Sequence, residues 1–344
     1  MSGRSSGRDL EARDLEALLP PGKLSPEEAL PPEEALPSEE ALPSEEALPR
    51  TEALHPATGG DTPASDPAAW LALFDEEEAR VSAALSAVAA PITDLARGMA
   101  RALRQGGRII SFGAGTSGRL AALDAAEWGP TFGIAPERVL ARIAGGEGAL
   151  TRAVEGAEDE LEPAREAVER LAIDARDLAI GISASGGAAY VRAALEAAAA
   201  RGAAVAWITA SPPPALEGGA APLRVTLDLG PELIAGSTRL QAATATHRVL
   251  QRASVLCAIE SGWIHRGRMV EMRPTNEKLR GRAVRIVSEL AAVDAEHARA
   301  SLAAADDDIK VALLHAALGL SIDAARQRLT EVDRHLSRIE GLPR

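Results

Sequence analysis

The chain has 344 residues, which is enough for one large domain or two modest ones with a hydrophobic core. Its formal net charge of −13 argues against binding to nucleic acid or to an anionic membrane surface. The single cysteine, Cys257, excludes an internal disulfide, and its apolar neighbours predict a buried helix position rather than a catalytic thiol. The sequence has no signal peptide and no apolar run of membrane-spanning length, so we expect a cytoplasmic protein.

The first part of the chain is a low-complexity segment of short repeats. Arg8-Asp-Leu-Glu-Ala recurs at Arg13, and the unit Leu-Pro-x-Glu-Glu-Ala begins at Leu30, Leu36 and Leu42. Regularly spaced prolines prevent a continuous helix, and the repeat has no period that would form an apolar face. We therefore expect a disordered acidic arm over residues 1–55, either a solvated tail or a segment that docks a partner.

Alternating helices and strands are predicted from residue 66 onward. Asp66 and Pro67 are suited to starting a helix, and a second helix over 92–103 precedes the first strand. Strands are expected at 109–112, 139–143, 178–183, 203–208 and 223–227, with helices over most of 151–171, over 188–200 and from 237 to about 260. This alternation predicts an α/β domain over 56–275 with a parallel sheet and right-handed crossovers. Residues 276–344 are expected to form a helical region, with helices at 278–290, 307–318 and 322–336.

The first strand runs into a loop of glycines and small hydroxyls at a helix start, Gly113-Ala-Gly-Thr-Ser-Gly118. We expect the glycines to let backbone approach a ligand, while Thr116 and Ser117 place hydroxyls beside the free N–H groups of the helix. An anionic or polyhydroxylated ligand fits such a loop. A tight turn without a ligand is the alternative interpretation.

Two further features of this segment bear on its chemistry. We expect Glu127 one or two turns into the same helix, with its carboxylate facing back toward the loop. A dinucleotide site is disfavoured, because it requires an acidic residue at the end of the second strand and the nearest candidate, Glu147, lies too far along.

The third strand ends in a similar loop, Gly181-Ile-Ser-Ala-Ser-Gly-Gly187. The hydroxyls of Ser183 and Ser185 and the free N–H groups at the following helix start are suited to a phosphate. Loops at the carboxyl ends of parallel strands gather around one crevice, so we expect both loops to share one site.

An acidic segment lies between the two loops, in Arg152-Ala-Val-Glu-Gly-Ala-Glu-Asp-Glu160. Glu155 and Glu158 are three residues apart and would share one face of the expected helix. A solvated acidic surface is one interpretation. The other is a carboxylate that joins Glu127 in the crevice as an acid/base pair.

Six motifs, in order along the chain, resemble the N-acetylmuramic acid 6-phosphate etherase family. They are Gly113-Ala-Gly-Thr-Ser-Gly-Arg-Leu120, Glu127 with Pro130-Thr-Phe-Gly133, Ile143-Ala-Gly-Gly-Glu147, Ala153-Val-Glu-Gly-Ala-Glu-Asp159, Gly236-Ser-Thr-Arg-Leu240 and Thr275-Asn-Glu-Lys-Leu279. This family is a lyase branch of the sugar isomerase (SIS) fold and is related to the glucokinase regulatory protein. The resemblance runs from about Thr51 to the C-terminal helices. It implies an SIS-type doubly wound parallel sheet, flanked by helices, that binds a sugar phosphate.

The resemblance implies a cytoplasmic homodimer that removes the D-lactyl ether of N-acetylmuramic acid 6-phosphate by elimination and then hydration. The products would be N-acetylglucosamine 6-phosphate and D-lactate, and no metal or organic cofactor is implied. Matched motif by motif, the family's proton donor is Glu127 and its second catalytic glutamate is Glu158. The expected substrate-binding residues are Gly115, Thr116, Ser117, Gly118, Glu147, Ser183, Ser185, Gly186, Ser237, Thr238 and Arg239.

Among the departures from the family pattern, three replace polar side chains near the expected ligand and keep other functions open. Gly187 and Ala188 replace an arginine and a threonine, and Gln241 replaces a lysine. The absence of each charge-assisted hydrogen bond to the phosphate would cost about 1.5–3 kcal/mol. The alternatives are a non-catalytic sugar-phosphate sensor, whose arm or helical tail engages a partner, and an aldose–ketose sugar phosphate isomerase. His247, His265 and His315 lack the spacing of a metal site.

Overall fold

The computed structural model describes residues 51, 53 and 66–343. In chain order the described residues form α1 (Pro67–Ala87), α2 (Ala89–Arg104), β1 (Ile109–Gly113), α3 (Gly115–Phe132), β2 (Val139–Ile143), α4 (Glu162–Arg170), β3 (Leu178–Ile182), α5 (Ala189–Ala200), β4 (Ala204–Thr209), β5 (Leu223–Thr226), α6 (Gln241–Glu260), β6 (Ile264–His265), β7 (Arg268–Met269), α7 (Glu277–Ala291), α8 (Ala295–Ala304), α9 (Ile309–Leu318) and α10 (Ile322–Glu331). The strands at β1 to β5 and the start of α1 at its N-cap Asp66 agree with the sequence predictions. The predicted arm lies outside the described residues, apart from Thr51 and Ala53.

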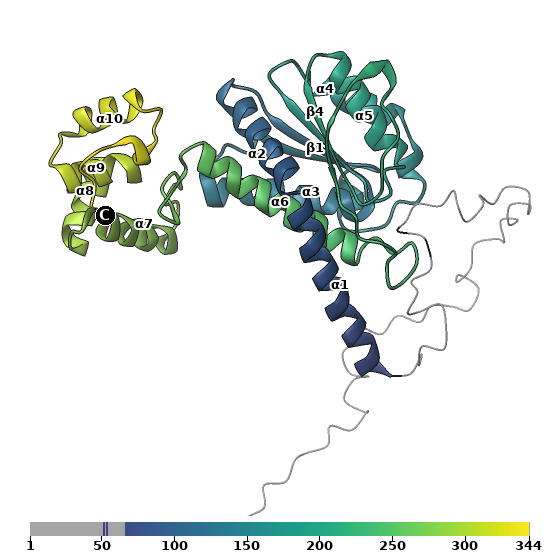
Figure 1. Ribbon diagram of the computed structural model, residues 1–344. Helices are drawn as coiled ribbons and strands as arrows, with labels where there is room; N and C mark the ends of the chain where they lie inside the picture. The colour runs from purple at the N-terminus through teal and green to yellow at the C-terminus, as the bar shows by residue number, and fades with distance from the viewer. Residues whose placement is uncertain (1–50, 52, 54–65, 344) are drawn as a thin grey trace, which may run out of the picture. The chain divides into compact units, whose positions relative to one another are not determined.

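The main sheet is parallel, with the strand order β2-β1-β3-β4-β5 (Figure 1). The chain adds β2 on one side of β1 and β3 to β5 on the other, so the winding direction reverses between β1 and β3. In open α/β sheets, ligands bind beside such a reversal, at the carboxyl ends of the strands. The order therefore singles out the loops that follow β1 and β3.

Helices cover both faces of the sheet, as the doubly wound prediction requires. Ile109 and Ile180 face a core shared with α1, α2, α3 and α6, whereas Ile110 and Phe112 face a core shared with α4 and α5. Successive residues of a strand point to opposite faces, which explains the division. No helix of the described residues has the length and apolar character needed to cross a bilayer.

The helices after residue 276 pack around a core of their own, which includes Leu302, Leu313 and Leu329. Within this group the ammonium of Lys310 is fully buried; it pairs with Glu271 and donates to the carbonyl of Arg334 at 2.8 Å. A buried charge requires partners of this kind. The predicted helical C-terminal region is confirmed, and α8 fills the gap between the helices expected from the sequence.

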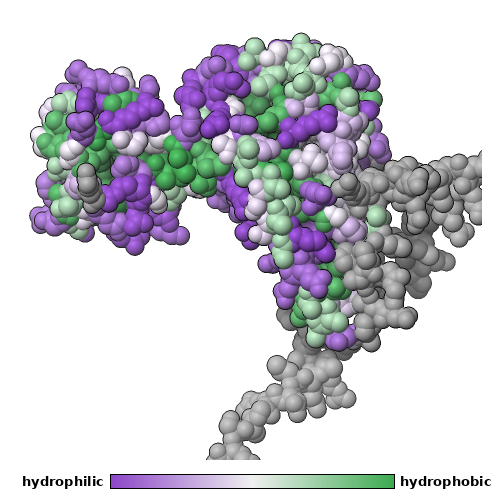
Figure 2. All heavy atoms as spheres, in the orientation of Figure 1, coloured by the Kyte–Doolittle hydropathy of each residue, from purple (hydrophilic) through white to green (hydrophobic). Residues whose placement is uncertain are grey.

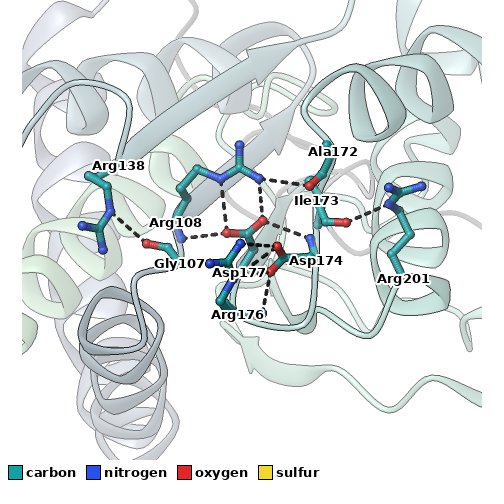
Figure 3. A network of polar contacts seen from close by, with 9 residues as sticks. All are labelled: Gly107, Arg108, Arg138, Ala172, Ile173, Asp174, Arg176, Asp177 and Arg201. Atoms are coloured by element: carbon teal, nitrogen blue, oxygen red, sulfur yellow. Dashed lines mark hydrogen bonds and ion pairs between the residues drawn. The ribbon is translucent and has the colours of Figure 1, made fainter.

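A network of charged groups joins the amino ends of β1 and β3 (Figure 3). The buried carboxylate of Asp177 accepts from the backbone N–H of Arg108 at 2.8 Å, from its guanidinium at 2.6 Å and from the N–H of Asp174 at 3.1 Å. Arg138, which precedes β2, donates to the carbonyl of Gly107 at 2.9 Å, so the start of β2 joins the same network. These contacts lie at the edge of the sheet opposite the ligand loops.

Candidate functional site

The carboxyl ends of three neighbouring strands lie side by side. Gly113, the last residue of β1, is paired with Ile143 of β2 on one side and with Ile182 of β3 on the other. Neighbouring strands are about 4.8 Å apart, so the loops that follow them begin close together. The structure thereby brings together eight of the predicted site residues, which are Gly115, Thr116, Ser117, Gly118, Glu147, Ser183, Ser185 and Gly186.

The loop after β1 exposes the start of α3. The N-cap, Ala114, has no capping side chain, and no other described residue provides a side-chain cap there. The N–H groups of Gly115, Thr116 and Ser117 precede the first helical hydrogen bond, which Gly118 donates to Ala114. Free N–H groups at the positive end of an 18-residue helix attract an anion.

The three glycines of this loop have different roles. A Cβ on Gly118 would lie 2.5 Å from Cγ1 of Ile143, and one on Gly113 would lie 2.6 Å from the N atom of Gly118. Gly113 and Gly118 therefore let α3 pack directly on β1 and β2, which corrects our expectation that all three glycines open the backbone to a ligand. Gly115 is exposed, with a φ of +51°, and remains available for a ligand to approach.

The loop after β3 holds its hydroxyls at the start of α5. The Oγ of Ser185 accepts from the N–H of Gly187 at 3.1 Å, and the Oγ of Ser183 lies 3.5 Å from the N atom of Ala188. Gly186 has a φ of +76°, and its missing Cβ lets the loop pack against Pro213. Both hydroxyls therefore lie where an anion bound at the helix start would contact them.

Ser211 was not found by sequence reasoning. It follows β4, its side chain is buried, and its hydroxyl has no hydrogen-bond partner among the described residues. The neighbouring Ala210 donates to the carbonyl of Ala184 at 2.8 Å, which ties this segment to the loop after β3. A single serine before three prolines carries no sequence signal of such a position.

Arg119 connects the first ligand loop to the acidic segment. From the second turn of α3, its guanidinium donates to the carbonyls of Leu150 at 3.2 Å and Arg152 at 3.0 Å. Val154 folds back over Gly145, where a Cβ would lie 2.9 Å from the valine Cβ. The segment that leads to Glu158 is thus held against the end of β2 and the start of α3.

The predicted helix over most of 151–171 is wrong for its first half. Gly156 has a φ of +72°, which interrupts helical backbone, and a short 3-10 turn follows at Ala157–Asp159. α4 begins at Glu162 with Pro163 in its first turn. Glu155 and Glu158 are exposed but do not share a helical face, and Ala157 is buried against α4 and α5.

Glu127 lies farther from the first loop than we expected. Since α3 begins at Gly115, Glu127 comes 127 − 115 = 12 residues later. That is more than three turns, or about 18 Å along the axis, rather than one or two turns. α3 packs on the α1, α2 and α6 side of the sheet, whereas the residue before Glu158 packs on the α4 and α5 side. Within one chain, the structure does not bring the two glutamates together.

Ser237, Thr238 and Arg239 precede α6 rather than starting it, because helical backbone begins at Gln241. They follow β5, which is two strands away from β3. Arg239 is exposed and lines a cavity of about 210 Å³ beside α1. The buried Gln241 donates from its side chain to the carbonyl of Pro231 at 2.6 Å, so its amide is engaged with backbone.

The remaining titratable candidates lie outside this edge of the sheet. Cys257 is buried in α6, as predicted, and burial raises the pKa of its thiol to about 12. His315 contacts the carbonyl of Leu320 at 2.6 Å, just after α9. The described residues contain no group of three or more His, Cys, Asp or Glu side chains that could hold a metal ion.

Comparison with known proteins gives consistent matches. The family model described as the glucokinase regulatory protein N-terminal SIS domain matches residues 92–199. The N-acetylmuramic acid 6-phosphate etherase of Cronobacter sakazakii is 41% identical over 257 residues, which cover 74% of this chain and 86% of that protein. The etherases of Rhodopirellula baltica and Halalkalibacterium halodurans are 38% and 40% identical, over 79% and 75% of this chain and 89% and 87% of their own lengths.

Proposed function

Because the chain belongs to the N-acetylmuramic acid 6-phosphate etherase family, we propose that it is a lyase that cleaves the D-lactyl ether of N-acetylmuramic acid 6-phosphate. The products are N-acetylglucosamine 6-phosphate and D-lactate. The observation that carries the proposal is the meeting of two helix starts, each with small hydroxyls, at the reversal point of the sheet. Incubation with N-acetylmuramic acid 6-phosphate and an enzymatic measurement of D-lactate tests it directly. A chain that binds the sugar phosphate but releases no lactate would instead be a sensor.

The phosphate lies, by this proposal, between the starts of α3 and α5. Ser117 and Ser185 supply hydroxyls, and the uncapped N–H groups supply the positive ends of two helix dipoles. Gly187 and Ala188 provide neither a charge nor a hydroxyl, so the backbone and the serines replace side chains that other members carry. Such neutral donors hold a phosphate less tightly than an arginine does.

The reaction needs one group that removes a proton and one that supplies a proton. When the sugar ring opens, its aldehyde acidifies the hydrogen on C2. We assign removal of that proton to Glu158. The electron pair left on C2 forms a double bond to C3 as the C3–O bond breaks, and Glu127 protonates the departing lactate oxygen. In the second half, Glu127 removes a proton from water as the water adds to C3, and Glu158 returns the proton to C2.

The separation of the glutamates supports a homodimer with shared sites. Glu127 lies about 18 Å along α3 from the ligand loops, so it reaches substrate only if it serves the site of a second copy. Leu123, one turn before it, is 46% exposed, and Val255 and Ile259 of α6 are 44% and 50% exposed. Figure 2 shows hydrophobic residues at the surface among the hydrophilic ones. Exposed apolar surface of this kind is typical of an interface. We place the homodimer in the cytoplasm, where 6-phosphorylated sugars are handled.

A further inference from the structure

Two carboxyl groups lie buried between α1 and the start of α6. Glu232 is completely buried, and Glu77 of α1 is 4% exposed. Neither residue belongs to the loops at the sheet reversal, and the proposed reaction uses neither. Carboxylates are rarely buried in full unless they hold other groups in place, so this pair requires a role.

The two carboxyls fix both ends of the loop that carries Ser237, Thr238 and Arg239. One oxygen of Glu232 accepts from the N–H of Gln241 at 3.0 Å, and the other accepts from the N–H of Ala242 at 3.1 Å. Glu77 accepts from the N–H of Leu233 at 3.1 Å. The side chain of Glu232 therefore closes residues 232–241 into a loop at the start of α6.

The tip of this loop differs from its base. Ile234 is 52% exposed, and Gly236 and Arg239 are also exposed, whereas Glu232 and Leu233 are buried. Gly236 donates to the carbonyl of Thr51 at 3.0 Å. The base of the loop is buried and its tip is exposed to solvent, which is an arrangement suited to presenting side chains to a ligand.

The buried surroundings of Glu232 and Glu77 favour a state in which the two carboxyl groups together carry one negative charge or none. The pKa of Glu232 is raised to about 7, chiefly by burial; the N–H groups of Ala242 and Gln241 and the charge of Arg80 oppose the rise, and the nearby charge of Glu77 adds to it. Burial also raises the pKa of Glu77. Two carboxylates in one buried space repel each other, so the pair keeps a proton into the neutral pH range.

We propose that Glu232, with Glu77 beside it, is a positioning residue that holds the Ser237–Arg239 tip closed while the pair carries a proton and releases the tip when both carboxyls are ionised. The direction of the pH dependence follows from the linkage between proton binding and loop closure. A buried pair that binds a proton more tightly than an exposed one is stabilised in its closed form at low pH, and the open form gains as pH rises. The closure of the loop does not depend on the proposed function; only the choice of substrate for the kinetic test rests on it.

Hydrogen exchange of the substrate-free protein tests the closure itself. We expect the amides of residues 233–242 to become less protected as pH rises from 6 to 8, after correction for intrinsic exchange with a peptide from α2. Glu232→Gln cannot ionise, and its one amide oxygen can accept from only one of the two N–H groups, so its protection should be lower than that of the wild type at pH 6 but should not change with pH. Glu77→Gln removes the neighbouring charge and so lowers the pKa of Glu232, and the loss of protection with pH should be smaller and complete at a lower pH. Glu76→Gln, an exposed neighbour on α1, should behave as the wild type.

The direction for Glu77→Gln follows because a like charge has been removed from the buried space, so an ionised Glu232 destabilises the closed form less than it does in the wild type. Steady-state kinetics gives the second readout. The KM of the wild type for N-acetylmuramic acid 6-phosphate, divided by that of Glu232→Gln at each pH, should rise between pH 6 and 8. One proton limits that rise to about tenfold per pH unit. Dividing one KM by the other cancels the effect that titration of the substrate phosphate has on both values. The kcat should change less than KM.

Protection that does not depend on pH in the wild type, or an unchanged pH dependence in Glu232→Gln, would overturn the proposal. Failure of the proposed function is a separate result. If the wild type releases no D-lactate, the exchange measurement still decides whether Glu232 closes the loop.

Discussion

Mixing two inactive variants should restore activity if Glu127 serves the site of a second copy. Glu127→Gln and Glu158→Gln each remove one acid/base group, so each variant alone should show a kcat about a hundred- to ten-thousand-fold lower. The distance of about 18 Å from Gly115 to Glu127 along α3 is far beyond the roughly 3 Å at which a carboxyl transfers a proton. On the proposal of a shared site, the two groups come from different chains.

The size of the recovery follows from two-fold symmetry. When equal amounts of the two variants exchange subunits at random, about half of the dimers contain one chain of each kind. In such a dimer one site combines both substitutions and the other combines both intact glutamates. About one quarter of all sites in the mixture are then intact, so the mixture should recover about one quarter of the wild-type rate.

The assay is D-lactate release after the two variants have been mixed and allowed to exchange. Each variant mixed with itself is the control, and two affinity tags allow the mixed dimer to be isolated and its subunit exchange confirmed. Isolated mixed dimers as inactive as the parents would show that Glu127 and Glu158 act within one chain. Near-normal rates in both single variants would remove the acid/base mechanism.

Four further predictions concern single residues. Ser185→Ala should raise KM for the 6-phosphorylated sugar and leave that for the unphosphorylated analogue unchanged, and an equal change in both would move the phosphate elsewhere. Arg119→Ala should lower kcat/KM by about tenfold, the equivalent of one charge-assisted hydrogen bond, with the melting temperature nearly constant. Asp177→Asn removes the buried charge of an ion pair whose arginine side chain is 25% exposed, and should cost about 1.5–3 kcal/mol and lower Tm by roughly 3–12 °C. Asp94→Asn, in an exposed pair, should cost at most about 1 kcal/mol, and equal shifts in calorimetry would refute the distinction. Because folding raises the pKa of Glu232 from 4.5 to about 7, the stability it contributes is complete below pH 4.5 and disappears as pH rises to about 7. Chemical denaturation at pH 5 and pH 8 should show that fall in the wild type and not in Glu232→Gln.

The fold was largely predictable because its signals are local. Short apolar runs mark β1, β3 and β4, and β1 and β3 are each followed by a helix that the Ala- and Leu-rich composition favours. Asp66 and Pro67 place the start of α1 for the same local reason. The error over residues 151–171 came from weighting the acidic and alanine residues above Gly156, whose positive φ breaks the helix.

The candidate site was predictable only in part, since some of its features depend on distant contacts. The loops after β1 and β3 could be placed together from the rule for parallel sheets. The unpaired hydroxyl of Ser211 and the closure of residues 232–241 by Glu232 depend on neighbours that only the folded chain brings into contact. The distance of Glu127 from the first loop could have been predicted, since the 12 residues from Gly115 to Glu127 already make more than three turns of a helix.

The charged network at the amino ends of the strands affects which positions of this protein can be substituted without loss of the fold. Arg108 and Asp177 fasten the central strands at one edge, so the loops at the opposite edge contribute little to holding the sheet together. Gly187 and Ala188 lie in one of those loops, where replacement of a side chain alters the contacts offered to a ligand. Ala188 is 6% exposed and packs in the core with α4 and α5, whereas variation at the exposed Gly187 is nearly uncoupled from folding. A library randomised there should consist mainly of folded proteins that differ in the sugar phosphate they accept, which makes this edge a natural starting point for directed evolution.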